Sequence, residues 1–198
     1  MDKSPDVLLE LVERLGNLLR AEFRRAGAEE QLQPVHVHAL VYLTRSNRYS
    51  NTPQAMAEYL GLTKGTMSQS LLLLDRRGLI ERYQDDLDRR VVRLRLSTGG
   101  EQFLAESQPQ SAWQNATRNI SPNRIRNAVS ALRETLATLQ SDSQGQPFGT
   151  CSGCRHIQRL SARAHRCGLM GDRLSGPETR KICWLYEEKG GSGSEPDE

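Results

Sequence analysis

Residues 52–96 read TPQAMAEYLGLTKGTMSQSLLLLDRRGLIERYQDDLDRRVVRLRL and contain two helical patterns followed by two β-rich runs. TPQAMAEYL predicts a first helix, GLT a tight turn, and KGTMSQSLLLLDRRG a second helix that closes at Gly78. LIERYQ and VVRLRLS predict two strands, and DDLDRR between them is too charged to pack, so it predicts an exposed hairpin tip. Helix, turn, helix and hairpin in this order predict a winged helix.

The second helix has the composition of a recognition helix. Thr63 is a suitable N-cap residue, and small, polar and basic residues follow it. Gly65 is costly inside a helix, which suggests that a phosphate or base edge approaches the backbone there. The residues expected to face DNA are Thr63, Lys64, Gly65, Thr66, Ser68 and Gln69. The residues expected to pack inward, by helical spacing, are Met67, Leu71 and Leu74 against Ala55, Met56 and Leu60. The alternative is an ordinary capped amphipathic helix.

The hairpin tip is a second, independent indication of DNA binding. Asp88 is expected to hold the loop by accepting hydrogen bonds from backbone amides. Arg89 and Arg90 then lie at the apex, where a wing meets phosphates or a narrow minor groove. Helix pair, cap and charged hairpin together favour DNA binding over a winged helix used only for protein contacts.

The stretch AEYLGLTKGTMSQSLLLLDRRGLIERYQDDLDRRVVRLRLSTGGEQFL resembles the MarR family of bacterial transcription regulators. The hairpin matches that family's D-x-R-D-x-R pattern at Asp85, Asp88 and Arg90, and STGGEQFL resembles the LTxxG entry to the next helix. The resemblance covers roughly residues 6–140 in length and order. The sequence departs from the family at Leu87, which replaces the first basic residue of the pattern. It also departs at residues 72–73, where two leucines replace polar residues.

The resemblance implies a DNA-binding transcription regulator, with repression as the expected action. MarR-like proteins often have a small-ligand crevice between the first two helices, beside the winged helix. His36, His38 and Tyr42 could line such a pocket. The alternative for a histidine near a helix start is a capping or surface position.

Four further helices are expected around the winged helix, and they make the chain mainly α with a small β wing. Their ranges are 6–25, 34–45, 99–119 and 122–139. The first and last carry long apolar stripes, more than one small winged helix can cover. We therefore expect residues 1–140 to form a DNA-binding and dimerisation domain whose homodimer reads a palindromic operator. The alternative is a three-helix layer within one chain.

Composition places the chain in a soluble, helical class. The 198 residues carry a net charge of +3 and only 5% aromatic residues. Neither a cleavable leader nor an apolar run long enough for a membrane span is visible, so we expect a protein of the bacterial cytoplasm. A Ser/His/Asp arrangement, a phosphate-binding loop and paired carboxylates in context are also missing, so no enzyme is predicted.

Residues 141–150 are rich in Ser, Gln, Gly and Pro and predict a linker. Beyond them, residues 151–186 hold all four cysteines of the chain with C-x2-C-x12-C-x15-C spacing, at Cys151, Cys154, Cys167 and Cys183. A short polar segment has too little apolar surface to fold unaided, so these thiols predict a metal-binding module. The alternatives are free reactive thiols or a redox dithiol at the first pair. Residues 187–198 are expected to be disordered.

The nature of the metal is left open between two candidates. Only the first two cysteines form a close pair, while the other two stand alone in helix-like sequence, so a 4Fe–4S cluster is favoured over zinc. Arg155, Arg159 and Arg163 are spaced by four and predict a basic ridge on a helix. The favoured function is a regulator that senses redox or iron state through this site. The alternatives are a metal-carrying protein with a winged-helix scaffold, or a regulator that senses a small aromatic ligand and contains a purely structural zinc.

Overall fold

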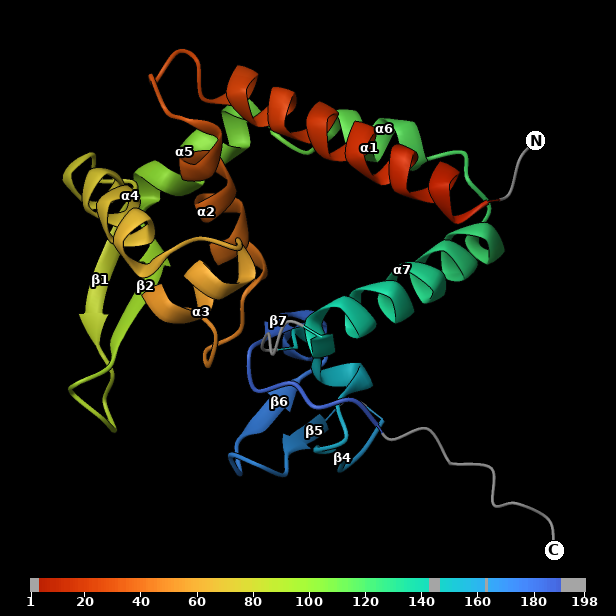
Figure 1. Cartoon of the computed structure of the whole chain (residues 1–198). Helices are drawn as coiled ribbons and strands as arrows, with labels where there is room; N and C mark the ends of the chain where they lie inside the picture. Colours follow the sequence, from red (N-terminus) through yellow and green to blue (C-terminus); the bar gives the residue numbers. More distant parts are fainter. Residues whose placement is uncertain (1–3, 143–146, 163, 190–198) are drawn as a thin grey trace, which may run out of the picture.

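The computed structural model describes residues 4–142, 147–162 and 164–189 (Figure 1). Its helices are α1 (Pro5–Ala26), α2 (Pro34–Arg45), α3 (Pro53–Tyr59), α4 (Lys64–Arg76), α5 (Thr98–Ser107), α6 (Ser111–Thr117) and α7 (Pro122–Asp142). Its strands are β1 (Ile80–Gln84), β2 (Val92–Leu96), β3 (Gly149–Thr150), β4 (Ile157–Arg159), β5 (Ala164–Cys167), β6 (Arg173–Ser175) and β7 (Ile182–Cys183). Two 3-10 turns, η1 (Cys151–Gly153) and η2 (Glu178–Arg180), complete the C-terminal part.

Local sequence determines where the first four helices begin. α1, α2 and α3 each start with proline, whose fixed φ suits the first helical position and whose missing N–H is not needed there. The caps of α3 and α4 are threonines: Thr52 Oγ1 accepts from the Ala55 N–H at 3.2 Å, and Thr63 Oγ1 accepts from the Thr66 N–H at 3.1 Å. These four helices lie where the sequence predicted them.

The helix predicted over residues 99–119 is wrong in one respect, because it is two helices, α5 and α6. α5 stops at Ser107, and Gln108 adopts the left-handed conformation with φ 41°. Pro109 follows and cannot continue an α-helical hydrogen-bond ladder. The chain therefore turns before α6 begins.

The core of the winged helix lies between α2, α3, α4 and the wing. β1 and β2 pair antiparallel, with Ile80 opposite Leu96 and Gln84 opposite Val92. The inward side chains are at most 2% exposed, namely Val37, Leu40, Met56, Met67, Leu71, Leu74, Ile80 and Leu94. The predicted packing of α4 on α3 is therefore confirmed. Burial of this much apolar surface is the main stabilising contribution in a domain of this kind.

The terminal helices of the first 142 residues behave differently from that core. The apolar side chains of α1 and α7 are between 36% and 64% exposed, at Leu8, Leu9, Leu11, Val12, Leu15 and Leu18 and at Ile125, Val129, Leu132, Leu136 and Leu139. Figure 1 shows α1 extending away from the winged helix, and α7 running from the far end of α1 back toward the C-terminal strands. The other described residues of the chain leave these stripes exposed, so a closed three-helix layer is not formed among residues 4–142, 147–162 and 164–189.

The C-terminal segment, residues 147–189, is built of short strands and 3-10 turns. The expected helical surroundings of Cys167 and Cys183 are therefore wrong, since these residues end β5 and β7. The basic ridge is wrong for the same reason: Arg159 ends β4, Arg155 precedes it, and Arg163 lies outside the described residues. β3 pairs with β7, and β4, β5 and β6 form a three-stranded antiparallel sheet.

The predicted boundaries around this segment also shift. Helix α7 continues to Asp142 and β3 occupies residues 149–150, so part of the predicted linker is regular structure; residues 143–146 lie outside the described part. At the other end, Glu187 lies 3.0 Å from His156 Nε2, so the ordered segment extends beyond residue 186. The rest of the predicted disordered tail, residues 190–198, is outside the described residues.

The C-terminal segment packs directly on the winged helix. Phe148 meets the ring of Tyr59 in a T-shaped contact with centroids 5.2 Å apart, and Trp184 Nε1 donates to Glu58 Oε2 at 2.8 Å. Ile182 is 8% exposed and belongs to the main core. The segment is therefore anchored on α3 and the preceding loop. Among the described helices, none combines the length and apolar character needed to cross a membrane.

Candidate nucleic-acid interface and cysteine cluster

The N-terminal half of α4 presents a polar, solvent-exposed face. The six residues predicted to face DNA, from Thr63 to Gln69, are all exposed, and Met67 between them is fully buried. The cap leaves Thr63 Oγ1 also 2.9 Å from Thr66 Oγ1, so the two hydroxyls form one small donor and acceptor surface. Small hydroxyls, an amide and one ammonium are groups that bond base edges and phosphates.

Gly65 is not required by the fold. Its backbone is helical, and an added Cβ would meet only Thr63 Oγ1, at an ordinary 3.9 Å. Glycine at a helical position without a steric reason lowers helix stability. A close external partner at this face would account for its presence.

The tip of the wing is held by two aspartates. Asp85 Oδ1 accepts from the backbone N–H groups of Leu87 and Asp88 at 2.9 and 3.0 Å, and Asp88 Oδ1 accepts from the Arg90 N–H at 3.0 Å. The Asp88 N–H, the Arg93 side chain and the Leu87 N–H lower the pKa of Asp85 to about 2. Asp88 bonds backbone as predicted, and Asp85, for which no such bond was predicted, does the same.

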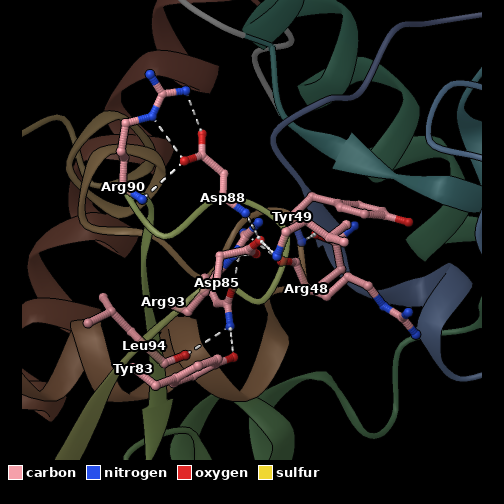
Figure 2. Close-up of polar contacts among 11 residues, drawn as sticks. Arg48, Tyr49, Tyr83, Asp85, Asp88, Arg90, Arg93 and Leu94 are labelled. Carbon is pink, nitrogen blue, oxygen red and sulfur yellow. Dashed lines mark hydrogen bonds and ion pairs between the residues drawn. The ribbon is translucent and has the colours of Figure 1, made fainter.

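Arg89 and Arg90 are exposed at this tip. The Arg90 side chain is 91% exposed, while its Nε and Nη2 each lie 3.0 Å from an Asp88 oxygen (Figure 2). That pairing fixes the direction of the guanidinium and leaves its outer edge open to solvent. Leu87, at the position of the family's basic residue, is 97% exposed and can supply only an apolar contact.

Arg93 is a functional candidate that sequence reasoning missed. Its Nε donates to Asp85 Oδ2 at 2.7 Å, both side chains are less than 20% exposed, and its Nη1 donates to the Arg48 carbonyl at 2.6 Å. The contact ties the base of the wing to the loop between α2 and α3, as Figure 2 shows. In the sequence Arg93 is an ordinary basic residue of a strand, so nothing marked it.

The loop between α2 and α3, residues 46–52, joins the wing to the C-terminal segment. On one side Asn51 Nδ2 donates to the Leu94 carbonyl at 3.0 Å, and the Leu94 N–H donates to the Asn51 carbonyl at 2.8 Å. On the other side the Arg48 and Tyr49 side chains point away from the wing (Figure 2). Arg48 Nη2 reaches Glu178 at 2.5 Å, and the Tyr49 hydroxyl donates to Asp172 at 2.6 Å.

The three residues predicted for a ligand crevice are not brought together. His36 Nδ1 accepts from the Gln33 N–H at 3.1 Å and completes the cap of α2, and Tyr42 is 1% exposed with its hydroxyl donating to the Ser50 carbonyl. His38 does line a cavity of about 550 Å³ between α1, α2 and α6, together with Phe23 and Trp113. Burial, aided by Arg45, lowers the pKa of His38, so its imidazole is neutral at pH 7.

The four cysteines lie at one end of the C-terminal segment. Cys151, Cys154 and Cys183 are buried, Cys167 is partly buried, and none forms a disulfide. The neighbouring Cys183 thiol raises the pKa of Cys151, and the Cys151 thiol is the main reason that the pKa of Cys183 falls to about 6. Within the described ranges, no three His, Cys, Asp or Glu side chains are already arranged around a point that would hold a metal ion.

Comparison with known proteins agrees with this fold. A sequence model of the MarR family matches residues 30–91. The crystal structure of the S. aureus MepR–DNA complex is 21% identical, over 69% of this chain and 99% of that one, with a TM-score of 0.53. A MarR family regulator from Silicibacter pomeroyi is 21% identical, over 65% and 86%, with a TM-score of 0.56. No match was found among curated proteins.

A third solved structure is a mutant MarR from E. coli complexed with operator DNA, 18% identical over 69% of this chain and 99% of that one, with a TM-score of 0.51. At such identities the likeness concerns the fold. It confirms the predicted winged helix-turn-helix fold. Residues 147–189 lie beyond the matched family segment.

Proposed function

We propose that this MarR-type winged-helix chain is a sequence-specific transcription regulator that binds double-stranded DNA as a homodimer. One observation carries the proposal: the capped first turns of α4 form an exposed polar face that the fold does not use, beside a wing on which Arg89 and Arg90 are exposed. Solved relatives of the same fold include complexes with DNA, namely MepR with DNA and MarR with operator DNA. Repression is the action we infer, since a bound dimer can exclude polymerase from a promoter.

The exposed stripes of α1 and α7 supply the dimer interface in this proposal. Eleven large apolar side chains on two helices form a surface that a soluble protein rarely leaves open. A second copy of the chain offers the same two stripes, and a two-fold interface is self-complementary by construction. The resulting dimer presents two α4 helices to successive major grooves of a palindrome.

An apolar small molecule is a proposed effector. The cavity beside His38 is lined mostly by apolar side chains, with Arg20 and Arg45 also in its wall, and its volume of about 550 Å³ suits a small aromatic ligand. Because α1 belongs to the proposed dimer interface, a ligand there would change the spacing of the two α4 helices. Occupancy of the cavity is thus one input, and the state of the cysteine segment, through redox or metal, is the second.

A metal carrier that uses the winged helix only as a scaffold is the other functional class considered. The described C-terminal residues contact α3 and the loop before it, and the polar face of α4 stays exposed. A scaffold would have no need of a free α4 face, so the regulator is preferred.

Selection of duplexes from a random pool by the purified full chain tests the proposal. The expected product is an inverted repeat whose half-sites are about 10 base pairs apart, bound with an affinity that falls steeply with salt. Recovery of no preferred sequence, with equal weak binding to all duplexes at low salt, would refute sequence-specific regulation.

A further inference from the structure

Strand register brings the four cysteines to one place. β3 and β7 pair with Gly149 opposite Cys183, which sets Cys183 beside the turn that starts at Cys151. β4 and β5 pair with Ile157 opposite Cys167, and the Ile157 N–H donates to the Cys154 carbonyl. The two strand pairings therefore place Cys183 and Cys167 near the C-x2-C turn, although both are distant from it in sequence.

The side chains at this point face inward together. Cys151 and Cys154 begin and follow a 3-10 turn, where residues three apart lie on the same side. Cys151, Cys167 and Cys183 pack in one cluster with Leu174. Three of the four cysteines therefore share one cluster, and Cys154 follows the turn that Cys151 begins.

The segment has little else to hold its fold. Its strands are two to four residues long, and its own apolar contribution to the cysteine cluster is Leu174 with the partly buried Ile157, Leu185 and Tyr186. A core of this size does not stabilise an independent fold. The free thiols add no covalent link.

The surroundings suit negative charge on the sulfur atoms. Asn47 Nδ2 lies 4.0 Å from Cys151 Sγ. Residues 151–189 contain eight Lys or Arg against four Asp or Glu. Donors to sulfur and an excess of cations offset the charge of thiolates around a divalent ion.

We propose that Cys151, Cys154, Cys167 and Cys183 together bind a single Zn²⁺ ion as thiolates. Each thiol that binds releases its proton to solvent, and its side chain turns toward the shared centre. Sulfur atoms around one tetrahedral zinc lie about 3.8 Å apart for Zn–S bonds of about 2.3 Å, a separation that suits side chains packed in one cluster. In a 4Fe–4S cluster each thiolate binds a different iron, so the sulfur atoms stand farther apart.

The ion would also fix the docking of the segment on the helix-turn-helix. Cys183 lies between Ile182, whose carbonyl accepts from the Asn47 N–H at 2.9 Å, and Trp184, whose N–H donates to Ser50 Oγ at 2.7 Å. Metal binding at Cys183 therefore holds both contacts with the loop between α2 and α3. Any effect on DNA rests on the proposed function, whereas metal binding and docking do not.

The first test is the metal content of the full chain purified under reducing conditions. One zinc per chain is expected, with neither iron nor acid-labile sulfide, and Co²⁺ exchanged into the site should show the absorption of tetrahedral thiolate coordination. Cys167→Ser should lower the bound zinc per chain. His165→Ala, which removes the imidazole on the same strand as Cys167, should retain it. A brown protein with iron and sulfide, or reduced protein that takes up no zinc, would overturn the single-ion site.

Protection of the thiols tests the site without any variant that could misfold. In the zinc-loaded wild type all four cysteines should resist alkylation, and a chelator should make all four reactive. Rapid alkylation of every cysteine in the zinc-loaded protein would refute four-thiolate binding.

Tryptophan fluorescence measures the docking of the C-terminal segment on the helix-turn-helix separately. In a Trp113→Phe background Trp184 is the only tryptophan, and removal of zinc should shift its emission to the red as it leaves Glu58 and gains solvent. An unchanged emission spectrum would refute the link between metal and docking. Both results stand whether or not the protein binds DNA.

Discussion

The winged helix and the C-terminal segment are stabilised in different ways. Between residues 52 and 96, side chains such as Met67 and Leu74 recur at helical spacing and are fully buried. Between residues 147 and 189, strands of two to four residues contain or adjoin the four thiols and pack against the loop before α3. A fold that depends on periodic apolar burial can be predicted from its sequence pattern. A fold that depends on thiols and on docking to another region cannot.

Separating the two copies of the chain should have the largest effect. Leu132→Glu with Leu136→Glu places charges in the exposed stripe of α7, so we expect a monomer whose operator affinity falls by about 10²–10⁴-fold as the second half-site is lost. Light scattering and fluorescence anisotropy measure the two results. Asn127→Glu with Ala131→Glu, also exposed but off the stripe, is the matched control. A monomeric wild type would end the dimer proposal.

Truncating one leucine in each region should separate their stabilities. Leu74→Ala, at a fully buried site of α4, is expected to cost about 2–5 kcal/mol and to lower the melting of the whole winged helix. Leu174→Ala should loosen only residues 147–189, because it lies in the cysteine cluster. Thermal melts followed by proteolysis of each region distinguish these outcomes. Equal loss across the chain in both variants would show one cooperative unit.

Two kinds of DNA contact should respond differently to mutation. Gln69→Ala on α4 should relax preference at particular base pairs by about 1–3 kcal/mol, because an amide reads base edges. Arg90→Ala at the wing should weaken binding to all sequences alike and reduce the salt slope by about one unit. Anisotropy on matched and mismatched duplexes over a salt series measures both. Unchanged binding in Arg90→Ala would remove the wing from the mechanism.

Substitution of Gly65 should have the smallest effect, and it should change stability and operator affinity in opposite directions. Gly65→Ala has room for its methyl group, so we expect the winged helix to gain about 0.5–1 kcal/mol in stability. The same methyl group should reduce operator affinity if DNA approaches this backbone. Denaturant unfolding measures the free energy of unfolding, and fluorescence anisotropy on the same preparation measures operator affinity. Tighter or equal DNA binding would mean that nothing approaches Gly65.

The sequence was sufficient for the winged helix because its patterns have local causes. Thr52 and Thr63 cap the helices they precede, and the aspartates of the hairpin bond the amides next to them. The split between α5 and α6 was not predicted, although Pro109 forbids one continuous helix there and could have indicated it. The role of Arg93 could not be predicted from the sequence, because its partners Asp85 and Arg48 contact it only in the folded chain.

The C-terminal segment was predicted less well for a physical reason. Arginines spaced by four suggested a helix, but the register of β3 with β7 and of β4 with β5 determines the path of the chain. Contacts such as Tyr49 with Asp172 join residues far apart in sequence and leave no periodic trace. The spacing of the cysteines predicted that they gather, but not on which surface.

Hydrogen–deuterium exchange of the full chain, with and without its selected duplex, tests most directly that α4 and the wing read DNA. The first amides of α4 lack acceptors within the helix, so a bound backbone or base edge should slow their exchange. We predict slower exchange in residues 63–69 and 85–91, with residues 151–183 unchanged. Binding of the duplex without protection in α4, or with protection only in the cysteine segment, would contradict the account.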